Sequence, residues 1–305
     1  MLTLLAMACT APTTDTAQDS GPQAGPVTLE LVEVVDINAV VATKGMDTRD
    51  GEQVYLWDYN QDQLQRWAGG QLSTLASGLV TSYGTDLAAD QAGAVYVTKG
   101  GESLGETIMK WDGQTGAPLW GDDGLVLPGA LLLGVDAADG ALYVADGSIP
   151  AIRILSAEGV EQAQVPLDAV PLDVAVGRDG TLLVLVSAVS NPLTTGQPVY
   201  LQKVDADGAI VAGPVEVSGA QYLTRGEDGL VYVSTSDFDA PTRTLYAFDG
   251  TLTQRAAVSL PASYVGFAGG IAAWGSGAGL RIGVMAQEGV GSAPICDLLV
   301  YGKID

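Results

Sequence analysis

A short motif recurs along the chain at intervals of about 40 to 50 residues, and this repetition restricts the fold more than any other feature. In each copy, a turn glycine is followed by an apolar triplet. The glycines are Gly51, Gly93, Gly140, Gly180, Gly229 and Gly279, and the triplets are 54–56, 95–97, 142–144, 182–184, 231–233 and 280–282. A unit of this size cannot bury a core alone, so neighbouring units must stack on one another.

A second marker follows each triplet, namely an apolar segment that ends near a bulky residue and a turn. The bulky residues are Trp67, Trp111, Leu155, Val204, Phe248 and Tyr301. Two independent markers keep the same order through all six units. This agreement favours a six-fold repeat over a sandwich with coincidental turns.

Each unit contains enough apolar segments and turns for four short strands. In the second unit we predict strands at 86–89, 94–98, 107–111 and 117–120. The Val-Tyr-Val triplet is apolar at adjacent positions, so its strand must be covered on both faces. Radially stacked sheets provide this cover. The predicted fold class is therefore all-β, a six-bladed β-propeller of four-stranded blades.

The two ends of the chain fit together in this scheme. The last unit stops after its third strand, and the segment VTLELVEVVD (27–36) precedes the first unit. We predict that this segment is the fourth strand of the last blade, because such pairing removes the open seam of a linear repeat. The propeller domain then spans 27–305.

The N-terminus begins with MLTLLAMACTAPTTDTAQDSGPQAGP, an apolar run that ends in small residues before Cys9. It resembles a bacterial lipoprotein signal, in which the cysteine is lipidated, although Ala6 stands where that pattern has Leu and basic residues are missing. Residues 10–26 have the composition of a flexible tether. We expect a signal segment at 1–9, a linker at 10–26 and a lipid-anchored protein on the outer-membrane or periplasmic side of the cell envelope.

Composition excludes several classes of function. The chain carries 36 acidic and 13 basic residues, so its formal net charge of −23 opposes binding to nucleic acid. It contains no histidine, which excludes Ser-His-Asp catalysis and histidine-ligated zinc. Cys9 and Cys296 are too few for a disulfide framework, and we expect Cys296 to be a buried, unreactive thiol.

The segment GVDAADGALYVADGSIPAIRILSAEG resembles an NHL-type repeat, with weaker similarity in GEQVYLWDYNQDQLQRWAGG and LDVAVGRDGTLLVLVS. The resemblance covers roughly 37–305 and implies a propeller that serves as a binding module. The related gluconolactonase-like group includes hydrolases that hold a divalent ion with Glu, Asn and Asp. The three asparagines here, Asn38, Asn60 and Asn191, lack the Asn-Gly context of those enzymes, so that activity does not carry over.

KWDGQTGAPLW (110–120) is similar to the docking motif of quinoprotein-type propellers, with Asp112, Gly116 and Trp120 at the matching positions. The motif occurs once instead of in every unit. We interpret it as local packing between blades and not as a sign of a quinone cofactor.

The connections after the second strands are long in four units, at 98–106, 187–198, 234–243 and 285–294. In a propeller these loops open at the same end as the connections between blades. Variable loops on a rigid scaffold are the usual place for recognition. The candidate residues of this long-loop face are Tyr83, Glu102, Asp237, Phe238 and Tyr264.

A second candidate site lies in the central channel. Asp86 and Asp173 begin first strands at equivalent repeat positions, and Asn38 is the corresponding residue of the first unit. These residues are either oxygen ligands for Ca²⁺ or acceptors of hydrogen bonds from neighbouring turn amides, and we favour the second interpretation.

The sequence favours a monomeric, non-catalytic binding protein without a cofactor, which recognises a protein, peptide or glycan through the long-loop face. The alternative is a metal-dependent hydrolase or lyase that uses carboxylates in the channel. A purely structural component of the envelope is the third hypothesis.

Overall fold

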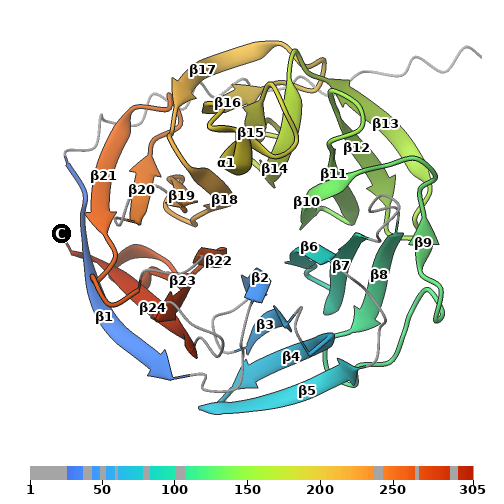
Figure 1. The fold of residues 1–305 in the computed structure, drawn as a ribbon, viewed down its shortest axis with the longest axis horizontal. Helices are drawn as coiled ribbons and strands as arrows, with labels where there is room; N and C mark the ends of the chain where they lie inside the picture. The colour runs from blue at the N-terminus through green and yellow to red at the C-terminus, as the bar shows by residue number, and fades with distance from the viewer. Residues whose placement is uncertain are drawn as a thin grey trace, which may run out of the picture.

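The computed structural model describes residues 26–36, 43–48, 53–58, 61–77, 83–100, 107–236, 243–264, 268–288 and 295–304. These residues form six four-stranded antiparallel sheets arranged radially around a central axis, as Figure 1 shows. Within the described ranges, helical structure is limited to α1 (Pro192–Thr195) and a 3-10 turn at Gly277–Gly279. The predicted fold class, a six-bladed all-β propeller, is confirmed.

Each blade runs from an innermost to an outermost strand in chain order, except that the last blade ends with the N-terminal strand. Blade 1 contains β2 (Thr43–Thr48), β3 (Gln53–Asp58), β4 (Gln63–Ala68) and β5 (Gln71–Ser77). Blade 2 contains β6 (Tyr83–Ala89), β7 (Ala94–Gly100), β8 (Thr107–Asp112) and β9 (Leu125–Val126). Blade 3 contains β10 (Leu132–Ala138), β11 (Ala141–Asp146), β12 (Ala151–Ser156) and β13 (Glu161–Pro166).

The other three blades follow the same plan. Blade 4 contains β14 (Val170–Val176), β15 (Leu182–Ser187), β16 (Val199–Val204) and β17 (Ile210–Glu216). Blade 5 contains β18 (Ala220–Arg225), β19 (Val231–Thr235), β20 (Thr244–Phe248) and β21 (Gln254–Ser259). Blade 6 contains β22 (Ala268–Trp274), β23 (Arg281–Glu288), β24 (Ile295–Ile304) and β1 (Thr28–Asp36).

The ring is closed as the sequence predicts. Strand β1 pairs antiparallel with β24, from Thr28 opposite Ile304 to Asp36 opposite Asp297. The amide of Val27 also donates to the carbonyl of Arg255 in blade 5, at 3.1 Å. The first described segment therefore joins the last two blades.

The outermost strand of blade 2 differs from the prediction. Residues 117–120 make only an isolated bridge, between Pro118 and Trp111, and the strand β9 comes later in the chain. Gly116 has a φ of +69°, and Pro118 has no N–H for a ladder. These two residues turn the chain out of the strand path. The Trp120 ring instead packs edge-on against Tyr96, at 5.6 Å between ring centroids.

Apolar side chains form one cluster at each of the six junctions between blades. In β7, Val95 and Val97 belong to the cluster shared with blade 1, whereas Tyr96 belongs to the cluster shared with blade 3. All three side chains are at most 1% exposed. The adjacent apolar positions of the triplets are thus explained by cover on both faces of the blade.

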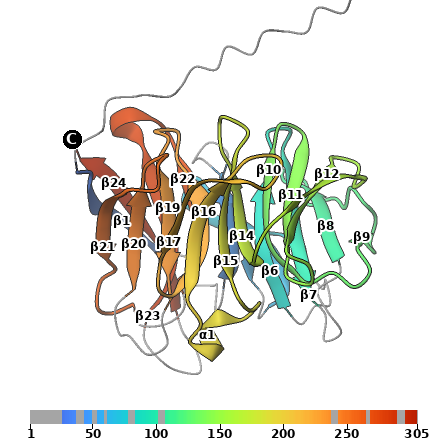
Figure 2. The same cartoon turned by 90° about the horizontal axis from the view of Figure 1, so that it is seen from above.

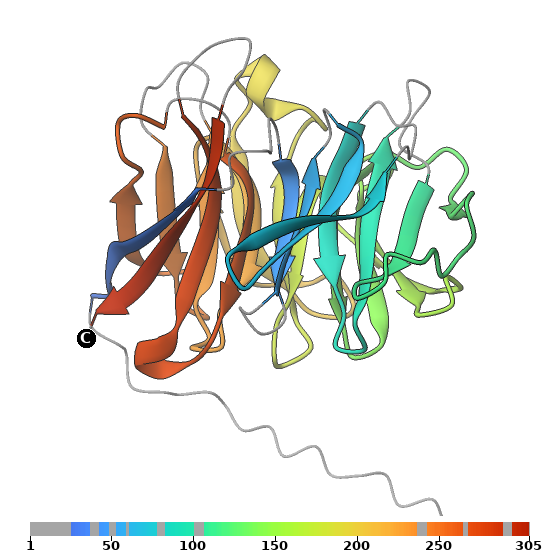
Figure 3. The same ribbon diagram turned by 90° about the horizontal axis from the view of Figure 1, so that it is seen from below.

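The two ends of the ring differ. Tight turns join the first and second strands at one end, and α1 lies at the opposite end, as Figures 2 and 3 show. In the described part of the chain, neither α1 nor the 3-10 turn has the length and apolar character needed to cross a bilayer.

Candidate functional site in the central channel

The six innermost strands surround a cavity of about 870 Å³. Its lining also includes residues of the turns that follow these strands, among them Asp139, Arg178 and Glu227. Because these turns lie at the end of the ring opposite α1, the cavity extends to the tight-turn end. This end is not the long-loop end that the sequence favours for recognition.

Four aspartates of the innermost strands connect consecutive blades through the channel wall; Asp86 and Asp173 are buried, and Asp47 and Asp136 are half-buried. In each case a carboxylate oxygen accepts a hydrogen bond from a backbone amide of the next innermost strand. The four pairs are Asp47 with Ala89 (2.7 Å), Asp86 with Val135 (2.9 Å), Asp136 with Val176 (2.7 Å) and Asp173 with Leu223 (2.7 Å). We call these four residues the bridging aspartates. They span every junction from blade 1 to blade 5.

Two of the bridging aspartates stand at a repeat position where alternate blades have glycine. Blades 2 and 4 place Asp86 and Asp173 where blades 1 and 3 have Gly45 and Gly134. A Cβ atom on Gly134 would lie 2.5 Å from Oδ1 of Asp173, and one on Gly45 would lie 2.5 Å from the amide nitrogen of Leu87. The next innermost strand approaches so closely that only glycine fits at these two positions. At Gly134, the space that a side chain would fill is occupied by the carboxyl group of Asp173 from the following blade.

Asp86 and Asp173 come from blades that are not neighbours, yet both carboxyl groups reach the same point of blade 3. Asp86 accepts the Val135 amide there, and Oδ1 of Asp173 lies against Gly134. The two carboxyl groups therefore interact with each other. Burial raises the pKa of both groups, to about 8 for Asp173 and well above the usual range for Asp86, and the proximity of Asp173 raises that of Asp86 further. The pair therefore retains a proton near neutral pH.

The other two bridging aspartates also favour protonation. Burial raises the pKa of Asp47 to about 7, against the hydrogen bond from the Ala89 amide. Burial likewise raises the pKa of Asp136, against the amides of Val176 and Ala137. Burial thus raises the pKa of all four bridging aspartates.

Blade 5 contributes a tyrosine and an arginine to the cavity. The Tyr222 side chain is partly buried, and its hydroxyl has no hydrogen-bond partner among the described residues. Burial, together with the negative charge of Asp86 and Asp173, raises its pKa. The guanidinium of Arg225 lies 4.0 Å from the carboxylate of Glu227, which also pairs with Arg178. Burial and the charge of Arg178 lower the pKa of Arg225.

The structure brings together two of the sequence-based channel candidates, Asp86 and Asp173. Each carboxyl accepts neighbouring backbone amides, those of Leu87 and Val135 for Asp86 and those of Val174 and Leu223 for Asp173. The third channel candidate, Asn38, lies outside the described residues.

The long-loop candidates that belong to the described residues, Tyr83 and Tyr264, do not form a site. Tyr83 begins β6, and Tyr264 is buried with its hydroxyl donating to Asp297 at 2.8 Å. Outside the described residues lie Cys9, Glu102, Asp237 and Phe238.

Sequence reasoning missed Asp47, Asp136, Tyr222 and Arg225 as channel residues. A signal for the first two exists, because Asp47 and Asp136 pair with the tyrosines of their triplets, Tyr55 and Tyr143. An acid at that register in two separate repeats points to a shared role.

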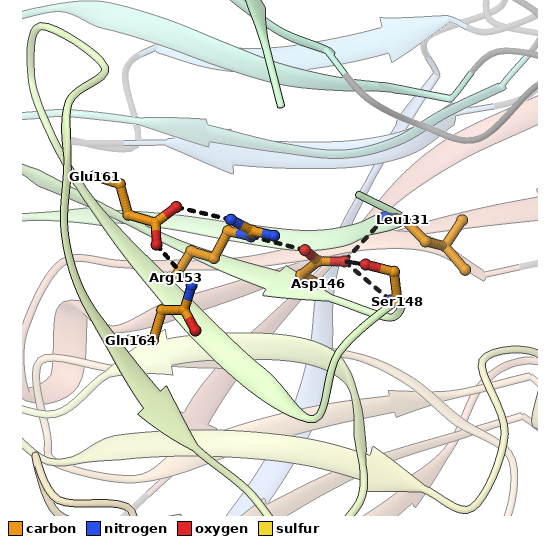
Figure 4. A network of polar contacts seen from close by, with 6 residues as sticks. All are labelled: Leu131, Asp146, Ser148, Arg153, Glu161 and Gln164. Atoms are coloured by element: carbon orange, nitrogen blue, oxygen red, sulfur yellow. Dashed lines mark hydrogen bonds and ion pairs between the residues drawn. The ribbon is translucent and has the colours of Figure 1, made fainter. Parts of the chain in front are cut away.

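A second polar network lies in blade 3, where β11 ends (Figure 4). The fully buried Asp146 accepts hydrogen bonds from the Leu131 amide, from the amide and hydroxyl of Ser148 and from Nε of Arg153. Arg153 also pairs with Glu161 at 2.7 Å. Although burial opposes ionisation, these hydrogen bonds hold the pKa of Asp146 below its usual value. The network is satisfied internally and fixes the loop after β11.

No group of three or more His, Cys, Asp or Glu side chains in the described ranges is arranged to bind a metal ion. Acids of the outer hairpins instead bind their own turns. Asp205 accepts the amides of Asp207 and Ala209, and Asp249 accepts those of Thr251 and Thr253.

Neither a family model nor a curated protein matches the sequence. Solved structures do match the fold. A PQQ-bound aldose sugar dehydrogenase from Streptomyces coelicolor has a TM-score of 0.65 and 14% identity, over 92% of this chain and 100% of that one. A streptogramin B lyase has a TM-score of 0.57 and 12% identity, over 90% and 98%. The gluconolactonase XC5397 from Xanthomonas campestris has a TM-score of 0.57 and 13% identity, over 91% and 96%. At these identities the likeness establishes the propeller fold alone.

Proposed function

We propose that this protein is a monomeric, non-catalytic binding protein of the bacterial cell envelope, and that it takes part of a protein, peptide or glycan ligand into the channel cavity. One observation carries the proposal: a cavity of about 870 Å³ whose lining includes Asp86, Asp173, Tyr222 and Arg225. Small-ligand sites are concave and have a few convergent polar groups, and this cavity falls in their usual size range.

The envelope location rests on the N-terminal sequence. The apolar run before Cys9 and the polar tether at 10–26 support a lipid anchor. Replacing Cys9 with serine should move the protein from the membrane fraction to the soluble fraction. Unchanged fractionation of the Cys9→Ser variant would exclude the anchor.

The long-loop face remains a further proposal for contact with a macromolecular partner. The length and unequal composition of the loops at 98–106, 187–198, 234–243 and 285–294 support it.

The alternative function is that of a metal-dependent hydrolase or lyase. It is favoured by the lyase and lactonase among the similar structures and by the paired carboxyl groups of Asp86 and Asp173. The chain has no histidine, and its described residues offer no three-ligand metal group. These two features favour binding over metal-assisted catalysis.

The full-length chain can be tested on glycan and peptide arrays together with two variants. Arg225→Gln changes the cavity, whereas Lys203→Gln removes an ion pair between β16, the third strand of blade 4, and Asp179 in the turn after β14, and neither residue of that pair lines the cavity. Binding that is lost in Arg225→Gln and retained in Lys203→Gln is the expected result. Retained binding in both variants would overturn the cavity as the site.

The same preparation separates binding from catalysis. Incubation with lactones and with the bound array ligands, with and without a divalent-metal chelator, should leave every compound intact. Chelator-sensitive turnover would contradict the non-catalytic role and favour the alternative.

A further inference from the structure

We propose that the channel cavity anchors its ligand by a primary ammonium group held between Asp86, Asp173 and Tyr222. This inference rests on the binding function proposed above and names the chemistry of the group that is recognised. Such a group occurs on amino sugars and on the lysine side chains of peptides.

The first argument is the fixed position of the two carboxyl groups. They belong to blades 2 and 4, and they meet because Gly134 of the intervening blade leaves the space between them open. The exposed fractions of Asp86 and Asp173 are only 7% and 3%. Backbone amides on both sides hold each carboxyl, at 2.8 Å and 2.7 Å for Asp173. The acceptors are therefore preorganised before any ligand arrives.

The second argument is the Tyr222 hydroxyl, which is independent of the acids. It lines the same cavity, it interacts electrostatically with both carboxyl groups, and it lacks a hydrogen-bond partner in the described structure. An ammonium group has three N–H donors and no acceptor. Two carboxylates and one hydroxyl oxygen provide three matching acceptors.

The third argument is charge. The cavity lining contains more carboxyl groups than guanidinium groups, and one guanidinium, that of Arg178, is already paired with Glu227. The titratable and charged groups around the pair are Asp47, Asp136, Asp139, Arg178, Tyr222, Arg225 and Glu227. Two buried carboxylates held close together repel each other, so one of them retains a proton. A cation can replace this proton and leave the net charge of the pair unchanged, whereas a neutral or anionic group cannot.

Binding then exchanges one cation for another. The O–H bond of the protonated carboxyl breaks, its electron pair stays on the oxygen, and the proton passes to the solvent. The ammonium ion takes its place between two ionised carboxylates without losing a proton of its own. Release of about one proton per bound ligand is the signature of this exchange.

Titration calorimetry on the full-length chain at pH 7 tests the proposal with matched probes. D-glucosamine and N-acetyl-D-glucosamine differ at the amine, and 1,5-diaminopentane represents a lysine side chain. We expect glucosamine or the diamine to bind with proton release, seen as a dependence of the binding heat on the ionisation enthalpy of the buffer. Binding of glucosamine alone identifies an amino sugar, and binding of the diamine alone identifies a lysine-like side chain.

Three variants complete the test. We expect Asp173→Asn to weaken amine binding at least tenfold and to abolish proton release, and Tyr222→Phe to weaken binding about threefold with the fold intact. Asp207→Asn, in an exposed outer turn, serves as the control and should bind as the unmodified chain does. Thermal unfolding confirms that each variant is folded.

Two results would overturn the inference. One is equal binding of glucosamine and its acetylated form, and the other is no binding of either amine. If neither amine binds while the array ligands still require Arg225, the ammonium site is wrong and the binding function stands.

Discussion

The junctions between blades 1 and 5 differ from the two junctions that flank blade 6. All six junctions contain an apolar cluster, but the bridging aspartates span only the first four among the described residues. At the corresponding positions, blade 5 has Tyr222 and Thr224, and blade 6 has Gly270 and Ala272. The channel wall is therefore held by the carboxyl groups of the bridging aspartates over one arc and by close backbone packing over the other.

The arc around blade 6 has a different means of closure. Strand β1 completes the sheet, and Lys303 of blade 6 lies 3.6 Å from Asp228 of blade 5. A Cβ on Gly270 would lie only 2.6 Å from the amide nitrogen of Met46, so blades 6 and 1 approach closely at the channel. Apolar packing is non-directional and stabilises every junction. Directional hydrogen bonds occur in addition at the four junctions that the bridging aspartates span.

The largest expected effect comes from removing β1. Deletion of 27–36 strips the ladder from β24 and exposes the face covered by Leu29, which is 4% exposed. Each ladder hydrogen bond contributes about 0.5–1.5 kcal/mol, so we expect the melting temperature to fall by at least about 10 °C or cooperative unfolding to disappear. Deletion of 1–25 is the control and should leave the melting temperature unchanged. A small shift on deletion of 27–36 would show that the ring does not depend on this closure.

The next-largest effect concerns one position of the innermost strands, which is Asp136 in blade 3 and Thr224 in blade 5. Asp136→Ala leaves the amides of Val176 and Ala137, both at 2.7 Å from the carboxylate, without their acceptor. We expect the free energy of unfolding to fall by about 1–3 kcal/mol. Thr224→Ala changes the equivalent position of blade 5 and should cost less than about 1 kcal/mol. Urea unfolding measures both, and equal losses would remove the distinction between the arcs.

A smaller effect is the pH dependence of stability. Burial raises the pKa of Asp47 to about 7 and that of Asp173 to about 8, so the folded state holds protons that the unfolded chain releases above its usual aspartate pKa. The resulting stability is complete below about pH 4 and is lost as the pH rises through 7 to 8. We expect the free energy of unfolding to fall between pH 5 and pH 8.5, because over this range the unfolded chain has released protons that the folded channel still holds.

Unfolding by urea across this pH range provides the measurement, and Asp173→Asn should flatten the profile. Acids with lowered pKa values act in the opposite sense. The Lys203 ammonium and Thr181 outweigh the effect of burial and lower the pKa of Asp179 to about 2, so its contribution is lost only in strong acid. Constant or rising stability from pH 5 to pH 8.5 would contradict the burial of the channel carboxyl groups.

The smallest effect concerns an exposed contact of the bridged arc. Arg178 and Glu227 pair between blades 4 and 5, but their side chains are 55% and 56% exposed. Exposed ion pairs contribute about 0–1 kcal/mol, so Arg178→Gln should change the free energy of unfolding by less than about 1 kcal/mol. A loss above about 2 kcal/mol would mean that surface charge, and not the buried aspartates, secures this junction.

The fold was predictable because its signals are local and repeated. Val95, Tyr96 and Val97 face two neighbouring blades, and that double cover leaves adjacent apolar residues in the sequence. The outer strand of blade 2 was not predictable, since Gly116 and Pro118 divert the chain within an otherwise strand-like segment.

The candidate site was predictable in part. Asp86 and Asp173 share one repeat position, and so the repeats reveal them. Asp47 and Asp136 lie two positions later, where blades 2 and 4 have Ala88 and Ala175. The repeats mark this position more weakly, through an acid opposite the triplet tyrosine in two blades only. The contribution of Tyr222 depends on how six strands converge, and no local pattern encodes that convergence.

Titration of the aspartate carboxyl carbons by NMR tests the central claim most directly, namely that carboxyl groups of two non-neighbouring blades are buried against each other in the channel. Samples with ¹³C-labelled aspartate, assigned through Asp86→Asn and Asp173→Asn, give the two titration curves. The structure predicts coupled curves, with Asp173 titrating near pH 8 and Asp86 titrating well above the ordinary aspartate range. Independent titration of both groups near the ordinary aspartate value of about 4 would contradict the account.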